Sequence, residues 1–178
     1  MPVFTPNKTW SVDEMANATL LNQYQRDNMK ATMHRLAYKT ADETVTNSTT
    51  LQNDDHLSFV TYPNDMWYLK LVLIVRQPAP VSFNSEIKVA FTFTAGALSL
   101  SSWTLDTGGG IGFKEWNTSG SSTGMDADLA YPNVHVIEGF LQAATTITTF
   151  QLQWAQATAD TGGVTVYKGS TLWGANIT

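Results

Sequence analysis

The sequence contains no cysteine, and this absence removes several kinds of site from consideration. Disulfides, iron–sulfur clusters and zinc sites built from thiolates all require cysteine side chains. Histidine is also scarce, because only His34, His56 and His135 are present and they lie far apart in the sequence. The one acidic cluster beside a histidine, Asp54-Asp55-His56, offers too few ligands for a metal ion on its own. We therefore expect no metal and no cofactor.

Charge is the second scarcity, at 14% of the 178 residues against roughly 25% in an average soluble protein. The net charge is −5 and no stretch is rich in lysine and arginine, so we expect no binding to nucleic acid. The longest apolar run, 71–75, is far shorter than the roughly 20 residues that span a bilayer. No signal peptide is visible either, so we expect no membrane insertion. Threonine, with 25 copies, makes the surface polar but weakly charged.

Motifs typical of catalysis are missing as well. The glycine-rich stretch 106–112 lacks the Gly-Lys-Ser/Thr ending of a phosphate-binding loop, and no Gly-x-Ser-x-Gly occurs. Asp126 and Asp128 could supply oxygens to a calcium ion, but the further acidic ligand and the glycine of a calcium loop are absent. The sequence therefore predicts that the protein is not an enzyme.

After the first 40 residues, apolar and polar residues alternate with the period of β-strands. The clearest strand is 86–94, in which alternate residues from Ile87 to Phe93 are expected to face inward. Residues 67–75 are apolar on both faces, a pattern typical of a central strand that is covered on both sides. Turn-forming residues recur at intervals of roughly 8–12 residues, which is typical of sandwiches. The sequence thus predicts a mainly β fold, with a jelly-roll-like antiparallel β-sandwich over 41–178.

The first 40 residues follow a different pattern. Residues 1–10 contain two prolines and no periodicity, which indicates an extended arm. Ser11 and Glu14 match a capping box, and helix-forming residues continue to Tyr38 as one bent helix or two short ones. The apolar side chains of this segment are too many for one face, so we predict that residues 1–40 anchor the protein and join copies of it. The residues assigned to anchoring and self-association are Trp10, Leu20, Leu21, Tyr24, Arg26, Met29, Met33 and Leu36.

Six tryptophans in a chain of this size raise the question of a binding surface. Trp116 lies beside the polar stretch 117–120, at the edge of the longest predicted loop. A tryptophan exposed there could stack on a sugar or fill a partner's pocket, whereas a buried one would plug the end of the sandwich. With both interpretations open, Trp116 and Tyr131 are the candidate contacts for a glycan or a partner.

Several segments resemble those of a known group of proteins. The segments 9–10 (TW), 18–24 (ATLLNQY) and 26–29 (RDNM) are similar to the N-terminal part of many tailed-bacteriophage virion proteins. The stretch 50–59 (TLQNDDHLSF) and the later segment 168–172 (KGSTL) resemble further parts of these proteins. Members of this group are described as structural, minor tail, head-fibre or decoration proteins.

The resemblance implies a non-enzymatic structural component of a phage particle, of the capsid-decoration or fibre type. Residues 1–40 would then anchor the chain to other virion proteins of the capsid or tail, and the sandwich 41–178 would be exposed. The resemblance also implies a homotrimer, located in the virion after assembly in the host cytoplasm. The alternative is a carbohydrate-binding protein of the tail that contacts a host-surface glycan during adsorption.

Overall fold

The computed structural model describes residues 34–77, 86–94, 96–105, 111–127 and 132–177, and within these ranges the regular secondary structure consists of strands alone. The strands are β1 (His34–Tyr38), β2 (Glu43–Val45), β3 (Gln52–Thr61), β4 (Met66–Arg76), β5 (Glu86–Thr92), β6 (Ala97–Leu105), β7 (Ile111–Trp116), β8 (Ser122–Asp126), β9 (Asn133–Gln142), β10 (Thr148–Gln156), β11 (Val164–Val166) and β12 (Thr171–Asn176).

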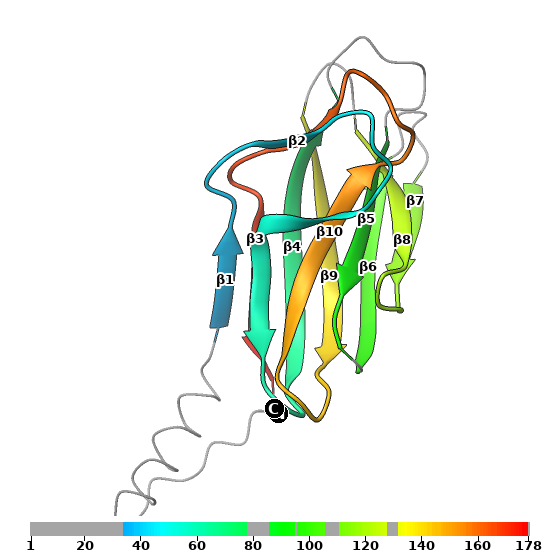
Figure 1. Cartoon of the computed structure of the whole chain (residues 1–178). Coiled ribbons are helices and arrows are strands. Elements are labelled where there is room, and N and C mark those ends of the chain that lie inside the picture. Colours follow the sequence, from blue (N-terminus) through cyan, green and yellow to red (C-terminus); the bar gives the residue numbers. More distant parts are fainter. Residues whose placement is uncertain (1–33, 78–85, 95, 106–110, 128–131, 178) are drawn as a thin grey trace, which may run out of the picture.

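These strands form two sheets that face each other (Figure 1). The larger sheet has the order β1-β12-β4-β9-β6-β7, with β11 beside β4 and β2 beside β11. The smaller sheet has the order β3-β10-β5-β8, and every strand pair in both sheets is antiparallel. The chain changes sheet at each step from β3 to β6 and again at each step from β7 to β10. The predicted antiparallel, mainly β sandwich is confirmed.

The core lies between the two sheets and follows the alternation of the sequence. In β5, Ile87, Val89 and Phe91 are buried as predicted, and Phe93, just after the strand, is partly buried against the core. Phe91 stacks on Phe150 of β10 with ring centroids 5.3 Å apart. Burial of each such side chain contributes about 1.5–3 kcal/mol, so this layer of apolar residues is the main force that holds the sheets together.

Strand β4 differs from the expectation that residues 67–75 are covered on both faces. Its odd-numbered residues from Trp67 to Val75 are buried in the core, but the even-numbered residues from Met66 to Arg76 are exposed or half-buried. In the part of the chain that the structure describes, the prediction that this strand is covered on both faces is therefore wrong. The apolar residues at its even positions lie on an outer surface instead.

At its C-terminal end, the predicted helix also differs from the structure. Residues 34–38 form β1, which pairs with β12 so that Leu36 lies opposite Trp173. The predicted helix is wrong over these five residues, because a short apolar pattern fits a period of two as well as 3.6 and the edge of β12 supplies hydrogen-bond partners. The remainder of that predicted helix, 11–33, lies outside the described residues, as does the predicted arm.

Gly139 allows β9 to continue through the middle of the larger sheet. A Cβ atom at this position would collide with the carbonyl oxygen of Ser99 on the neighbouring strand β6. Glycine is therefore required here by the close approach of two backbones, and β9 runs unbroken from Asn133 to Gln142.

Candidate functional site

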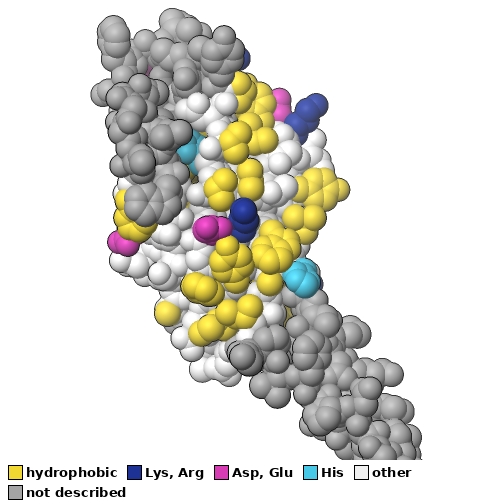
Figure 2. Space-filling model, turned by 180° about the vertical axis from the view of Figure 1, so that it is seen from behind, with side chains coloured by type: hydrophobic (Ala, Val, Ile, Leu, Met, Phe, Trp, Pro, Cys, Tyr) yellow, Lys and Arg dark blue, Asp and Glu magenta, His cyan; other side chains and the backbone are white. Residues whose placement is uncertain are grey.

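The outer face of the larger sheet, meaning the side turned away from the smaller sheet, carries a broad group of exposed apolar side chains. Figure 2 shows them as a band of hydrophobic side chains along this side of the molecule. The exposed fractions are 64% for Leu36, 61% for Val134, 57% for Tyr38 and 51% for Phe140. Contiguous apolar patches of this kind commonly mark interaction sites on soluble proteins. The large apolar members of the outer face are Leu36, Tyr38, Met66, Tyr68, Val72, Ile74, Phe113, Val134, Val136, Phe140 and Trp173.

The strand register makes this patch continuous. The β4–β9 register places Val72 opposite Val136 and Ile74 opposite Val134. Because residues directly opposite each other in an antiparallel pair lie on the same face, each pair extends the apolar surface across two strands. β12 and β1 extend it further, since Trp173 pairs with Leu36. The patch is thus a property of the whole sheet and does not depend on a single loop.

The aromatic rings of the outer face are inclined to one another. The ring of Tyr68 lies 5.6 Å from that of Phe140 at an interplanar angle of 59°, and 6.0 Å from that of Trp173 at 73°. His34 stacks on Trp173 at 5.5 Å. Tilted rings pack well among themselves. They do not form a coplanar platform on which successive sugar rings could stack.

Two opposite charges lie in the middle of this apolar face. Lys70 of β4 is directly opposite Glu138 of β9, and Figure 2 shows a positive and a negative side chain among the hydrophobic ones. The Tyr68 hydroxyl donates a hydrogen bond of 2.8 Å to Glu138 Oε2, and this bond raises the pKa of Tyr68 above its usual value, with smaller contributions from burial and from the negative charge of Glu138. Among the described residues, none forms a hydrogen bond or an ion pair with the Lys70 ammonium.

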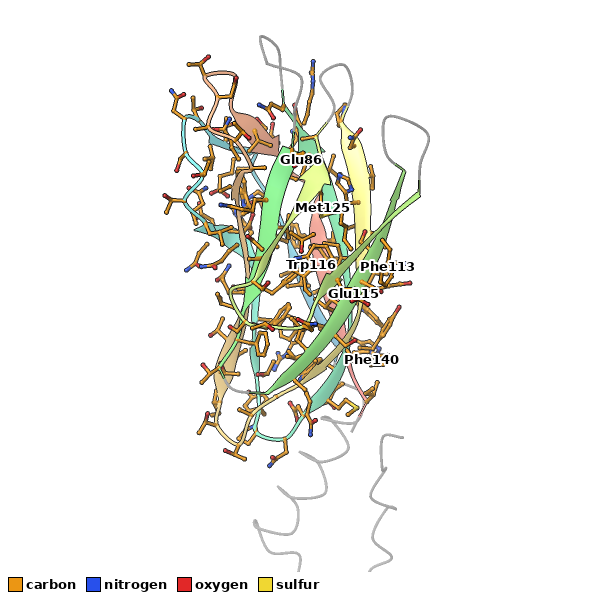
Figure 3. The ribbon with its side chains drawn as sticks, turned by 90° about the vertical axis from the view of Figure 1, so that its right-hand side faces the viewer. Glu86, Phe113, Glu115, Trp116, Met125 and Phe140 are labelled. Atoms are coloured by element: carbon orange, nitrogen blue, oxygen red, sulfur yellow. The ribbon has the colours of Figure 1, made fainter. Side chains whose placement is uncertain are left out.

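Trp116 is not part of a surface. It is 1% exposed, its Nε1–H donates a hydrogen bond of 2.9 Å to the carbonyl oxygen of Val89, and its ring meets Phe91 edge to face. Figure 3 shows Trp116 and Met125 within the sandwich, whereas Phe113 and Phe140 point outward. Of the two interpretations of Trp116, the buried one is therefore confirmed and its role as a glycan or partner contact is not, because this side chain fills the space between β7 and β5. Tyr131 lies outside the described residues.

A cluster of buried charges lies elsewhere, at the start of the sandwich. The Lys39 ammonium contacts Asp54 at 2.7 Å and Glu43 at 2.6 Å. Asp54 also accepts hydrogen bonds from two backbone amides at 2.8 and 2.9 Å and from Trp154 Nε1 at 3.1 Å. With both carboxylate oxygens occupied in this way, we assign the cluster a structural role.

The remaining features of the described residues offer less chemistry. A hollow beside β3, β5 and β10 is lined by threonines and by Val60, Phe93 and Ile147, and none of its lining residues is titratable. No group of three or more His, Asp and Glu side chains is placed to hold a metal ion in the described ranges. No helix in these ranges is long and apolar enough to cross a membrane.

The residues assigned to anchoring from the sequence divide into two groups. Leu36 lies on the outer face, in β1, and is exposed. The other seven, from Trp10 to Met33, lie outside the described residues. The apolar residues at even positions of 67–75 were the sequence signal for the outer face, whereas its residues on β9 and β12 were missed.

Comparison with known proteins adds little to this description. No family model matches the chain, and no curated protein matches its sequence. Among solved structures, the chain is similar to the CBM22-1–GH10 modules of xylanase 10B from Clostridium thermocellum, crystallised with xylohexaose, with a TM-score of 0.33 and 7% identity over 79% of this chain and 28% of that one. It is also similar to a structure of infectious bursal disease virus, Gt strain, with a TM-score of 0.23 and 11% identity over 82% of this chain and 41% of that one. The chain thus spans less than half the length of either structure, and it is a β-sandwich whose family these matches leave open.

Proposed function

We propose that the protein is a non-enzymatic structural component of a tailed-phage particle, and that the outer face of the larger sheet is its assembly surface. The observation that carries this proposal is the continuous band of exposed apolar side chains across β1, β12, β4 and β9. The resemblance of the sequence to phage virion proteins supports the type of particle.

The composition of the outer face is that of an interface core. Interface cores are depleted in charge and enriched in aromatic residues, and this face combines Tyr38, Tyr68, Phe140 and Trp173 with aliphatic side chains. Each Å² of apolar surface removed from water contributes about 25 cal/mol, so an exposed face of this kind favours association. If no partner covered this face, its exposed apolar surface would instead promote non-specific aggregation.

The order of the strands supports the finer description as a jelly roll. The strands β1-β12-β4-β9 face β3-β10-β5-β8, and the chain alternates between the two sets of four. This is the order of an eight-stranded jelly roll made of two Greek keys, in which the hairpin β6–β7 widens one sheet. Jelly rolls occur in viral capsids and in lectins, so the fold is compatible with the proposal without selecting it.

In this proposal residues 1–33 anchor the chain to other virion proteins, and the sandwich is exposed as a capsid decoration or fibre. The described sandwich begins at β1, so the anchor joins it at the edge of the outer face. Three copies are the number that the resemblance implies. The carbohydrate-binding alternative loses one of its two candidate contacts, because Trp116 is buried, and the other, Tyr131, lies outside the described residues.

Incorporation into particles tests the proposal. We expect Val136→Asp, which places a charge on the outer face, to reduce the amount of the protein in purified particles of the phage that encodes it. Val60→Asp is a matched control, since Val60 is exposed to a similar extent, 44% against 38%, but lies on the smaller sheet. Normal incorporation of a folded Val136→Asp variant would contradict the role of the outer face.

A second variant tests the anchor. Deletion of residues 1–33 leaves all of β1 in place, whereas a deletion up to residue 40 would also remove a strand and the buried Lys39. We expect the shorter deletion to retain the circular-dichroism spectrum of a β protein and to be absent from particles. Its incorporation at the level of the full chain would contradict the anchoring role of these residues.

A further inference from the structure

We propose that the outer face packs against further copies of this same chain around a rotation axis that runs along its strands, so that Lys70 of each copy pairs with Glu138 of the next. This inference rests on the proposed function, because it names the partner of the assembly surface. It is drawn from the charges of the face and from their position along the strands.

The charges of the outer face favour a second copy as its occupant. Along β4 and β9 the neighbours of Lys70 and Glu138 on this face are apolar, Ser101 of β6 lies beside Glu138, and no described residue pairs with the Lys70 ammonium. A partner that presents an anion and a cation at this level of the sheet matches each charge with its opposite, and charge complementarity of this kind favours a specific partner. Another copy of this face brings both.

The register of the sheet places the two charges at the same position along the strands. Lys70 and Glu138 are direct partners in the β4–β9 pair. A rotation about an axis parallel to the strands does not change the position of a residue along that axis. The β4 side of one copy therefore meets the β9 side of the next copy with the two charges level, and a closed ring satisfies every copy equally.

The apolar neighbours complete this contact. Val72 and Val136 lie next to the charged pair on one side, and Tyr68 and Phe140 lie next to it on the other. When two such faces meet, these side chains exclude water from the ion pair, as the ring of weaker contacts around an interface hot spot does. The hydrogen bond from Tyr68 to Glu138 holds the carboxylate in place among them.

Light scattering on the purified full-length chain tests the proposal. We expect a mass that is a multiple of 19.5 kDa, and about 58.5 kDa for the three copies that the resemblance implies, as 3 × 19.5 kDa. Lys70→Glu and Glu138→Lys should each weaken assembly, with the dissociation constant raised at least about tenfold by the like charges brought together. Asp55→Lys, which makes the same change of charge as Glu138→Lys at an exposed site on the smaller sheet, should leave the mass unchanged.

Mixing the variants shows whether the contact lies between copies. In a mixture, a contact between a Lys70→Glu copy and a Glu138→Lys copy brings opposite charges together, whereas a contact between two copies of the same variant brings like charges together. The mixture should therefore assemble better than either variant alone. The double variant Lys70→Glu/Glu138→Lys should also assemble. A monomeric wild-type chain, or single variants that assemble like the wild type, would overturn the proposal.

The outcomes separate this inference from the proposed function. If the chain is monomeric but Val136→Asp still blocks incorporation into particles, the outer face binds another virion protein, and the pairing of copies is wrong. If the chain assembles through Lys70 and Glu138 but Val136→Asp enters particles normally, the pairing stands and the role of this face in particle assembly is wrong.

Discussion

The Lys39 ammonium lies 2.7 Å from Asp54 Oδ2, and both side chains are completely buried. Lys39 follows β1 directly and Asp54 belongs to β3, so this ion pair connects the edge of the larger sheet to the smaller one. Removal of one partner leaves the other charge buried and uncompensated, which is far more costly than the loss of an exposed pair.

We expect Lys39→Met to lower the free energy of unfolding by about 3–5 kcal/mol, because it leaves Asp54 and Glu43 without their cation. Lys168→Met provides a control, since Lys168 is exposed, and should change stability by less than about 0.5 kcal/mol. Urea unfolding followed by tryptophan fluorescence measures both values. Equal stability of the two variants would show that the pair contributes little.

We expect Trp116→Ala to lower the free energy of unfolding by about 3–5 kcal/mol, because it removes a large side chain from the core. Trp116→Phe should cost less, about 1–3 kcal/mol, mainly because the carbonyl oxygen of Val89 loses its hydrogen bond. Phe113→Ala on the same strand is the matched control, since Phe113 is 46% exposed and should affect assembly more than folding. A similar loss of stability in the Phe113 and Trp116 variants would contradict this assignment.

We expect Gly139→Ala to destabilise the larger sheet by about 1–3 kcal/mol or more, since the added methyl group forces β9 and β6 apart at Ser99. Gly120→Ala gives the comparison, because no atom lies within 4 Å of a Cβ built there and its cost is the left-handed backbone alone, about 1–2 kcal/mol. Thermal unfolding should rank Gly139→Ala as the less stable variant. The opposite order would mean that the two strands separate easily.

The hydrogen bond from Tyr68 to Glu138 predicts a dependence on alkaline pH. Because the pKa of Tyr68 is raised, the stabilisation that this bond contributes is present below the ordinary value of 10.0 and is lost as the pH rises through the raised value. Titration of tyrosinate absorbance should show a late step that Tyr68→Phe removes. If Tyr68→Phe instead removes a step at or below pH 10, the bond to Glu138 does not form in solution.

Much of the sandwich could be predicted from the sequence, because the alternation of apolar and polar residues with a period of two directly indicates a strand with one buried face. The inward residues Val89, Phe91 and Leu152 are examples. The same rule cannot say which face of a doubly apolar strand is covered, so Val72 and Ile74 were expected to be buried. The sequence left the burial of Trp116 open for a related reason, since a short loop signal beside it does not reveal a buried partner such as Val89.

The start of the sandwich shows why short segments are harder to predict. Leu36 fits both the spacing of a helix face and the alternation of a strand, and five residues contain too little pattern to decide between them. The deciding interaction is the edge of β12, which lies more than 130 residues further along the chain and leaves no local trace in the sequence.

The position of β1 also has a mechanical consequence. If residues 1–33 hold the chain to a particle, a force on the exposed sandwich enters it at residue 34, the first residue of β1, and a pull in the direction of β1 loads this strand. The hydrogen bonds of β1 to β12 are perpendicular to that direction, so they bear the load in shear and together, and do not open one after another. At the far end of the strand, Lys39 is fixed by the carboxylates of Asp54 and Glu43, so slippage of β1 along β12 would have to pull an ammonium group out of the core before the first strand could leave the sheet.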